Sequence, residues 1–171
     1  CGVTTEDWAP KHPGATLVWV AVDDKPSLCL AIVDPLRAET PRALQTMFGM
    51  GLRVAVLTGD TPAAARAALE ATKIDTARVD VRASCAPPDK LAYVNACREG
   101  GAGVLFVGDG VNDAPALAAA SVGVAMGAGG TAMAVDAADV ALMTDDVALL
   151  PAANPSRPAW TTACSSCRAS A

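Results

Sequence analysis

The chain has 171 residues, a formal net charge of −5, and 52% hydrophobic but only 4% aromatic residues. A chain of this length and hydrophobicity can bury its own core, which excludes a disordered protein. The acidic balance argues against a nucleic-acid binder, and we expect no nucleic-acid partner. The first residue is Cys1 rather than Met, so we expect a fragment or a processed product.

Short apolar runs alternate with helical patterns along most of the chain. The first two runs predict a pair of strands, 17–22 and 28–33, joined by the turn-forming residues 23–27. Helices and strands are then predicted in alternation: helix 39–50, strand 53–57, helix 62–72, strand 79–81, helix 87–99, strand 104–107, helix 113–120, strand 122–125, helix 131–137 and strand 140–143. Strands that are apolar throughout and separated by helices are typical of a parallel sheet covered on both faces. We therefore expect a Rossmann-like α/β fold with its functional residues beyond the carboxyl ends of the strands.

Two segments need separate interpretations. Residues 114–135 carry no charge, but they are mostly Ala and Gly, which offer little apolar area, so they predict helix–strand–helix rather than a membrane span. Residues 151–171 show no periodicity and are rich in Pro, Ser, Ala and Thr, so we expect a disordered tail. The tail holds Cys164 and Cys167, which could hold part of a metal site, but the sequence places no second cysteine pair and no His nearby.

Polar residues follow two of the predicted strands. Thr58-Gly59-Asp60 comes directly after strand 53–57, where a hydroxyl and free backbone N–H groups could seat a phosphate; an ordinary helix cap would use the same residues. Gly108 to Asp113 follows strand 104–107 and supplies two carboxylates, Asp109 and Asp113, with the amide of Asn112. Such oxygen ligands suit Mg²⁺, which keeps several waters for a phosphate partner.

A basic residue completes the set of candidate site residues. Lys90 lies in the run Pro88-Asp89-Lys90 at the start of helix 87–99. A lysine in the first turn of a helix opposes the helix dipole, which favours a functional reason for its position. Its charge would stabilise a transferring phosphoryl group.

These motifs together resemble the phosphorylation domain of P-type ATPases, within the haloacid-dehalogenase-like superfamily. The resemblance covers about residues 15–148, and Asp34-Pro35-Leu36-Arg37 is similar to the hinge motif that re-enters that domain. The short interval between Asp60 and Asp109 is similar to the heavy-metal-transporting branch. The resemblance divides the chain into the end of a nucleotide-binding domain with its return strand (1–33), the C-terminal part of the phosphorylation domain (34–150) and the tail (151–171).

The resemblance also implies a role for each matched residue. Thr58 and Lys90 would be catalytic, and both would contact phosphate together with Gly59 and Asp60. Asp109 and Asp113, supported by Asn112, would bind Mg²⁺, and Asp34 would be the hinge. The substrate would be ATP, hydrolysed through an aspartyl phosphate to transport a heavy-metal cation. The parent would be a multi-pass membrane protein that spans the bilayer through segments outside this sequence, with these residues on the cytoplasmic side.

One family motif is not in the sequence. The phosphorylated aspartate of the family lies in Asp-Lys-Thr-Gly-Thr, on a strand between those that end at Thr58 and Asp109. We therefore expect the central strand of the sheet to be missing, the chain to be marginally stable, and the chain alone to be inactive. Two alternatives stay open: a free-standing phosphatase that uses Asp23 or Asp24 as its nucleophile, and a non-catalytic module that binds Mg²⁺ and phosphate.

Overall fold

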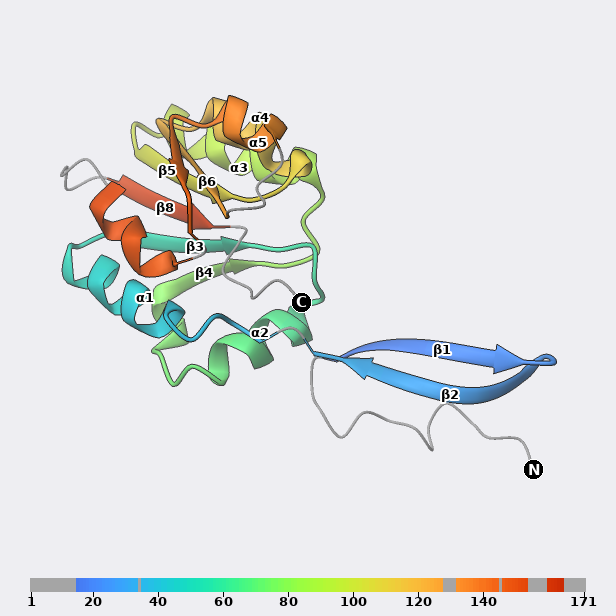
Figure 1. Ribbon diagram of the computed structural model, residues 1–171. Helices are drawn as coiled ribbons and strands as arrows, with labels where there is room; N and C mark the ends of the chain where they lie inside the picture. The colour runs from blue at the N-terminus through green and yellow to red at the C-terminus, as the bar shows by residue number, and fades with distance from the viewer. Residues whose placement is uncertain (1–14, 34, 128–131, 145, 154–159, 165–171) are drawn as a thin grey trace.

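The computed structural model describes residues 15–33, 35–127, 132–144, 146–153 and 160–164, with the backbone alone at residues 16, 152–153 and 160–164. The described residues form an α/β body and a two-stranded hairpin that projects from it (Figure 1). Of the sequence predictions, the hinge residue Asp34 lies outside the described residues.

The hairpin pairs β1 (Thr16–Val22) with β2 (Lys25–Ile32) in antiparallel register. Its turn is only two residues long, shorter than the predicted connection 23–27. Asp23 and Asp24 both have left-handed backbone conformations, with φ of 50° and 59°. That pair of conformations matches the twist of the strands, so the tight turn extends β2 toward the N-terminus.

The body contains a six-stranded parallel sheet in the order β4-β3-β8-β5-β6-β7. Its strands are β3 (Arg53–Leu57), β4 (Val79–Arg82), β5 (Gly103–Gly108), β6 (Val122–Met126), β7 (Val140–Leu142) and β8 (Trp160–Cys164). Its α-helices are α1 (Thr40–Gly49), α2 (Pro62–Glu70), α3 (Pro87–Glu99), α4 (Ala114–Ala119) and α5 (Ala132–Ala137), with short 3₁₀ helices η2 (Thr76–Arg78), η3 (Val111–Asp113) and η4 (Val147–Ala153). The predicted alternation of strands and helices is confirmed, with ends that differ by one or two residues.

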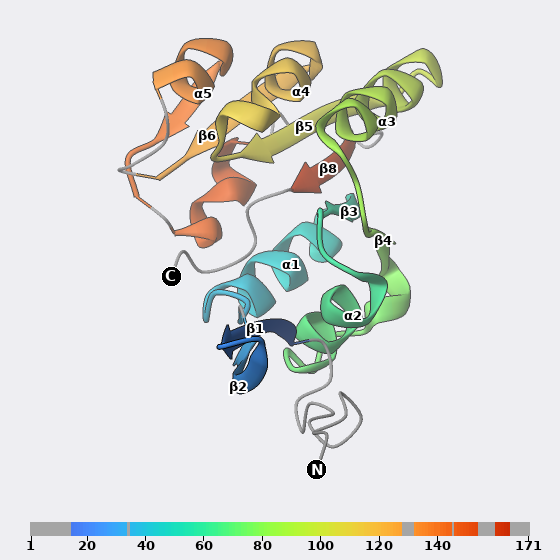
Figure 2. The ribbon, with the colours of Figure 1, turned by 90° about the vertical axis from the view of Figure 1, so that its right-hand side faces the viewer.

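Both faces of the sheet are covered. Helices α3, α4 and α5 lie on one face, and α1, α2 and η4 lie on the other (Figures 1 and 2). Alternate residues of β5 enter the two cores: Val104 and Phe106 join the core under α3 to α5, whereas Leu105 and Val107 join the core under α1 and η4. Continuous apolar strands are therefore required here, because each strand is buried on both sides.

The centre of the sheet differs from the sequence prediction. Strand β8, from the segment expected to be a disordered tail, lies between β3 and β5 and pairs with both in parallel. We expected no strand at this central position of the sheet, but β8 occupies it. The centre of the sheet is therefore not left open, and the marginal stability that we expected from a missing central strand loses its basis.

The uncharged segment 114–135 gives α4, β6 and the first part of α5. Within the described ranges, none of the helices has the length and apolar content needed to cross a bilayer. This agrees with the helix–strand–helix interpretation of the segment.

Candidate functional site

The loop after β3 is held by hydrogen bonds to the loop after β4. The Thr58 N–H donates to the Arg82 carbonyl at 2.9 Å, and the Cys85 N–H donates back to the Thr58 carbonyl at 2.9 Å. The Ser84 N–H donates to the Asp60 carbonyl at 2.7 Å. These bonds fix the backbone of Thr58 to Asp60 as a short turn at the carboxyl end of the sheet.

The side chains of this loop form a local cluster. The Thr58 hydroxyl donates to Asp60 Oδ2, and the Asp60 N–H donates to Thr58 Oγ1 at 3.2 Å. Thr61 then caps α2 by accepting from the Ala64 N–H at 3.2 Å. The N-cap of α2 is therefore Thr61, which follows the Thr58-Gly59-Asp60 motif.

The loop after β5 is packed more tightly. Asp113 is only 4% exposed, and a Cβ atom added to Gly108 would lie 2.6 Å from Asp113 Cβ. Only glycine allows the end of β5 to approach Asp113 this closely. Asp109 and Asn112, in contrast, are exposed.

Lys90 joins this loop from α3. Its Nζ atom lies 2.8 Å from Asp113 Oδ1, and the two side chains are 13% and 5% exposed. The predicted site residue Lys90 is thus brought into direct contact with the predicted site residue Asp113. The Lys90 ammonium group therefore places a positive charge directly beside the Asp113 carboxylate.

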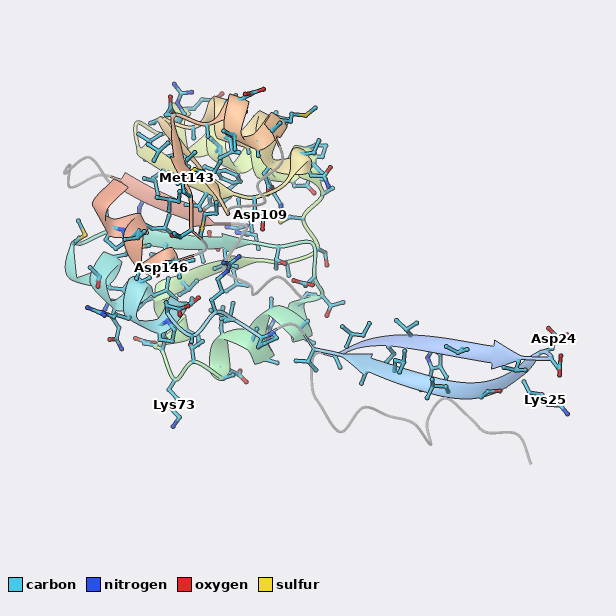
Figure 3. The ribbon with its side chains drawn as sticks, viewed as in Figure 1. Asp24, Lys25, Lys73, Asp109, Met143 and Asp146 are labelled. Atoms are coloured by element: carbon cyan, nitrogen blue, oxygen red, sulfur yellow. The ribbon has the colours of Figure 1, made fainter. Side chains whose placement is uncertain are left out.

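Not every candidate lies in this region. Asp24, offered as an alternative nucleophile, lies with Lys25 at the tip of the hairpin, far from Asp109 (Figure 3). The turn that holds Asp23 and Asp24 is therefore remote from the strand ends. The structure gives no support to a phosphatase that combines these carboxylates with Asp109.

The predicted Mg²⁺ site can be tested against the side chains that could act as metal ligands. Among the described residues there is no group of three or more His, Cys, Asp or Glu side chains placed to hold a metal ion. Mg²⁺, however, commonly uses one or two carboxylates and completes its shell with waters and phosphate. The exposed Asp109 and the buried Asp113, which both follow β5, fit that requirement for two carboxylates.

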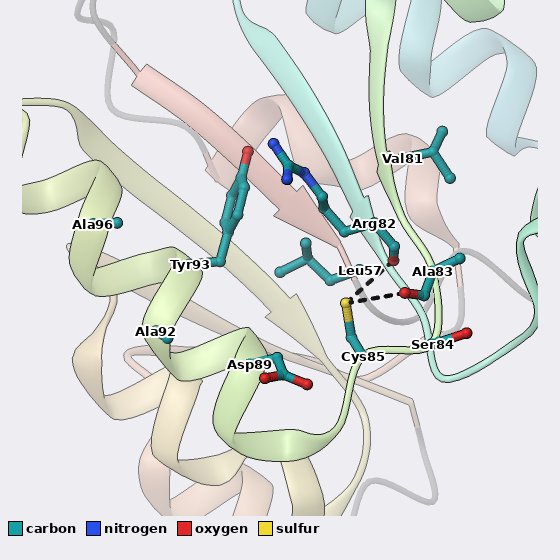
Figure 4. A pocket seen from close by; sticks show the side chains of 10 residues that line it. All are labelled: Leu57, Val81, Arg82, Ala83, Ser84, Cys85, Asp89, Ala92, Tyr93 and Ala96. Atoms are coloured by element: carbon teal, nitrogen blue, oxygen red, sulfur yellow. Dashed lines mark hydrogen bonds between the residues drawn. The ribbon is translucent and has the colours of Figure 1, made fainter.

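Sequence reasoning missed a cavity of about 540 Å³ beside the β3 loop, between the ends of β3 and β4 and helix α3 (Figure 4). Its lining includes Arg82, Cys85 and Tyr93, and the Cys85 thiol faces the carbonyls of Arg82 and Ala83 at 3.4 and 3.8 Å. Burial, and secondarily the charge of Asp89, raises the pKa of Cys85. No sequence motif marks this cavity, because its lining residues come from three separate elements.

Comparison with known proteins places this arrangement in a family. A family model described as haloacid dehalogenase-like hydrolase matches residues 4–121. The chain belongs to the haloacid dehalogenase-like hydrolase family. The parallel sheet with helices on both faces is the architecture that we predicted, so the predicted fold class is confirmed.

Curated relatives narrow the resemblance within the haloacid dehalogenase-like family. The chain is 40% identical over 142 residues to copper-transporting ATPase 1 of Rhizobium meliloti, which covers 83% of this chain and 17% of that protein. It is 39% identical over 134 residues to the zinc-transporting ATPase of Bacillus subtilis, covering 78% and 20%. The resemblance to heavy-metal P-type ATPases is thereby confirmed, and the chain spans about a fifth or less of the length of these relatives.

Comparison with solved structures gives matches to the same class of ATPase. A zinc-transporting PIB-type ATPase in the E2.Pi state matches with a TM-score of 0.65 and 34% identity, covering 81% of this chain and 22% of that one. The catalytic domain of a CPx-ATPase matches with a TM-score of 0.61 and 27% identity, covering 79% and 52%. The match to a catalytic domain shows that these residues correspond to a part of such proteins.

Proposed function

We propose that this chain is part of the phosphorylation domain of a heavy-metal-transporting P-type ATPase, and that its strand-end loops bind Mg²⁺ and a phosphoryl group. The observation that carries the proposal is the buried Lys90–Asp113 ion pair, 2.8 Å long, at the carboxyl end of β5. It joins two residues that the sequence motifs selected independently. The names of the metal-transporting relatives support the parent activity.

Each residue of the proposed site has a chemical task. Asp109 and Asp113 would hold Mg²⁺, oriented by Asn112, and the bound ion would neutralise charge on phosphoryl oxygens. Thr58 would donate its hydroxyl to a phosphoryl oxygen, and Gly59 would leave its backbone N–H accessible. Lys90 would position the Asp113 side chain through its hydrogen bond and supply positive charge near the transferring group.

The coupling to transport belongs to the proposed parent protein. There, ATP would phosphorylate an aspartate, and hydrolysis of the aspartyl phosphate would drive a heavy-metal cation across the membrane, with these residues on the cytoplasmic side. The sequence contains no Asp-Lys-Thr-Gly-Thr. We therefore assign Mg²⁺ and phosphate binding, without turnover, to this chain alone.

Isothermal titration of the full chain with Mg²⁺, in the presence and absence of inorganic phosphate, tests the proposal. We expect phosphate binding that requires Mg²⁺, and a Mg²⁺ affinity at least tenfold weaker in Asp109→Asn. Asp24→Asn is the matched control, since it removes an equal charge at the hairpin tip. Equal effects of the two substitutions, or no heat from Mg²⁺ at millimolar concentration, would contradict the proposal.

The free-standing phosphatase makes a different prediction. It requires release of phosphate from a phosphate ester by the purified chain, abolished by substitution at Asp23 or Asp24. The position of that turn at the hairpin tip favours the binding assignment instead (Figure 3). Turnover that disappears in Asp24→Asn would reverse this choice.

A further inference from the structure

Residues 83–86 join β4 to α3, and the two ends of this connection are held in different ways. At the α3 end, the Ala86 N–H donates to Asp89 Oδ2 at 2.8 Å, which closes the first turn of the helix. The next residue, Lys90, forms the ion pair with Asp113 in the loop after β5. The α3 end of the connection is therefore fixed to the β5 side of the proposed site.

The β4 end of the connection is bonded to the loop after β3 by backbone groups. The Ser84 N–H donates to the Asp60 carbonyl at 2.7 Å, and the Cys85 N–H donates to the Thr58 carbonyl at 2.9 Å. In an extended strand two successive N–H groups point in opposite directions, whereas here both donate to one loop. Ser84 makes this possible, because its φ and ψ set the direction of the Cys85 N–H relative to its own. Its φ is 55°, in the left-handed region that residues with a Cβ atom rarely adopt.

The backbone of Ser84, rather than its side chain, carries this contact. The side chain is exposed, and its Oγ lies 3.5 Å from the Asp60 carbonyl oxygen, which is longer than a usual O–H···O bond. Unfavourable backbone conformations persist only where the surrounding structure requires them, and they are concentrated at functional sites. Lys73 provides a comparison within the chain, since its φ is 57° but it lies between α2 and η2, away from Asp109 (Figure 3).

We propose that Ser84 is a positioning residue of the candidate site, whose left-handed backbone holds the β3 loop in the conformation in which Thr58 and Gly59 bind a phosphoryl group. The inference rests on the Mg²⁺ and phosphate binding proposed above. A loop that is already fixed in its binding conformation loses less entropy when the ligand binds, which increases affinity. The candidate Mg²⁺ ligands, Asp109 and Asp113, follow β5 instead. A change at Ser84 should therefore weaken phosphate binding and leave Mg²⁺ binding unchanged.

Isothermal titration of the full chain with inorganic phosphate at saturating Mg²⁺ tests the proposal through substitutions of Ser84. Ser84→Val places a β-branched side chain in a left-handed conformation that it strongly disfavours, so the β3 loop should no longer be fixed. We expect phosphate affinity to fall about tenfold, while Mg²⁺ affinity measured without phosphate stays within about twofold of the wild-type value. Urea denaturation establishes that each variant is folded under the conditions of the titration.

Further variants separate the backbone of Ser84 from its hydroxyl. Ser84→Gly and Ser84→Asn accept the left-handed conformation and should keep phosphate affinity within about twofold of the wild-type value. Ser84→Ala removes only the hydroxyl and should do the same. Lys73→Val is the matched control, because it places the same side chain at a φ of 57° away from the site, and it should not change phosphate affinity. If Ser84→Val does not fold, Ser84→Thr takes its place, and phosphate affinity should fall severalfold although the hydroxyl is kept.

Failure of this inference differs from failure of the proposed function. No phosphate binding by the wild-type chain would overturn both, whereas equal phosphate affinities of the wild-type chain and the β-branched variant at Ser84 would overturn the positioning role alone. A parallel loss of Mg²⁺ and phosphate affinity in that variant, or an equal loss in Lys73→Val, would show an effect through general stability and would also overturn the role. A loss in Ser84→Ala as large as that in Ser84→Val would assign the effect to the hydroxyl instead of the backbone.

Discussion

The loops after β3 and β5 flank the same central strand but are built on different principles. The β3 loop, Thr58 to Asp60, is held by hydrogen bonds, and a Cβ atom on Gly59 would lie 3.7 Å from its nearest neighbour, an ordinary contact. The β5 loop, Gly108 to Asp113, is held by close packing and a buried ion pair. We infer that the β5 loop is a fixed platform and that the β3 loop has space for a ligand.

The largest expected effect comes from removing the ion pair that holds the β5 loop. Lys90→Ala removes the ion pair between Lys90 Nζ and the buried Asp113 carboxylate, which we expect to lower the free energy of unfolding by about 3 kcal/mol. Urea denaturation followed by circular dichroism measures it. Lys25→Ala, at the hairpin tip, is the control and should change stability by less than about 0.5 kcal/mol. Equal losses in the two variants would show that the ion pair does not support the fold.

The second prediction compares the two glycines directly. Gly108→Ala forces a Cβ atom to within 2.6 Å of Asp113 Cβ, so one of them must shift. We expect a loss of about 2 kcal/mol, typical of overpacking. Gly59→Ala meets only an ordinary contact and should cost less than about 0.5 kcal/mol. The same denaturation experiment serves both, and a reversed order would remove the distinction between the loops.

Sequence reasoning reached most of the body and only part of the site. The alternation of apolar strands with helices is a local pattern, so residues such as 53–57 and 104–107 predict their own strands. The sequence motifs also selected Lys90 and Asp113 as site residues, each from a separate motif. The sequence could not show that Lys90 and Asp113 are in contact, because this contact depends on how α3 packs against the β5 loop.

Strand β8 shows the limit of pattern-based prediction. Residues 160–164 form neither an apolar run nor an alternation of apolar and polar residues, so the sequence alone does not distinguish them from an irregular segment. Its pairing is determined by two partners elsewhere in the chain, β3 and β5, whose backbone groups would otherwise be unpaired in the core. The two-residue hairpin turn was missed for a different reason, since Asp-Asp is a weaker turn signal than Asn-Gly or Asp-Gly.

The third prediction concerns the β3 loop. Thr58→Ala removes the hydrogen bonds between Thr58 and Asp60, which we expect to cost about 1 kcal/mol of folding free energy. Phosphate affinity in the presence of Mg²⁺ should fall about tenfold, or about 1.4 kcal/mol. Thr58→Ser keeps the hydroxyl and should restore most of the affinity. Loss of stability without loss of phosphate binding would make this loop structural like its neighbour.

The smallest effect probes the cavity beside the β3 loop through Cys85. Burial, followed by the charge of Asp89, raises the pKa of this thiol, so at a given pH less of it is the reactive thiolate. We expect the rate at which iodoacetamide modifies Cys85 to rise with pH with a midpoint above the ordinary thiol pKa of about 8.5. Mass spectrometry measures the modification site by site. The same reaction in urea should return to the ordinary midpoint.

The sign of the accompanying stability change follows from linkage. The folded chain binds the Cys85 proton more tightly than the unfolded chain, so its contribution to stability is complete below the unfolded pKa and is lost as the pH rises through the folded pKa. Asp89→Asn keeps an oxygen that can accept from the Ala86 N–H but removes the charge. It should lower the alkylation midpoint only part of the way, because burial is the larger cause. A midpoint already ordinary in the folded wild-type chain would show that the β3 side is open to solvent at Cys85, and would sharpen its contrast with the closed β5 loop.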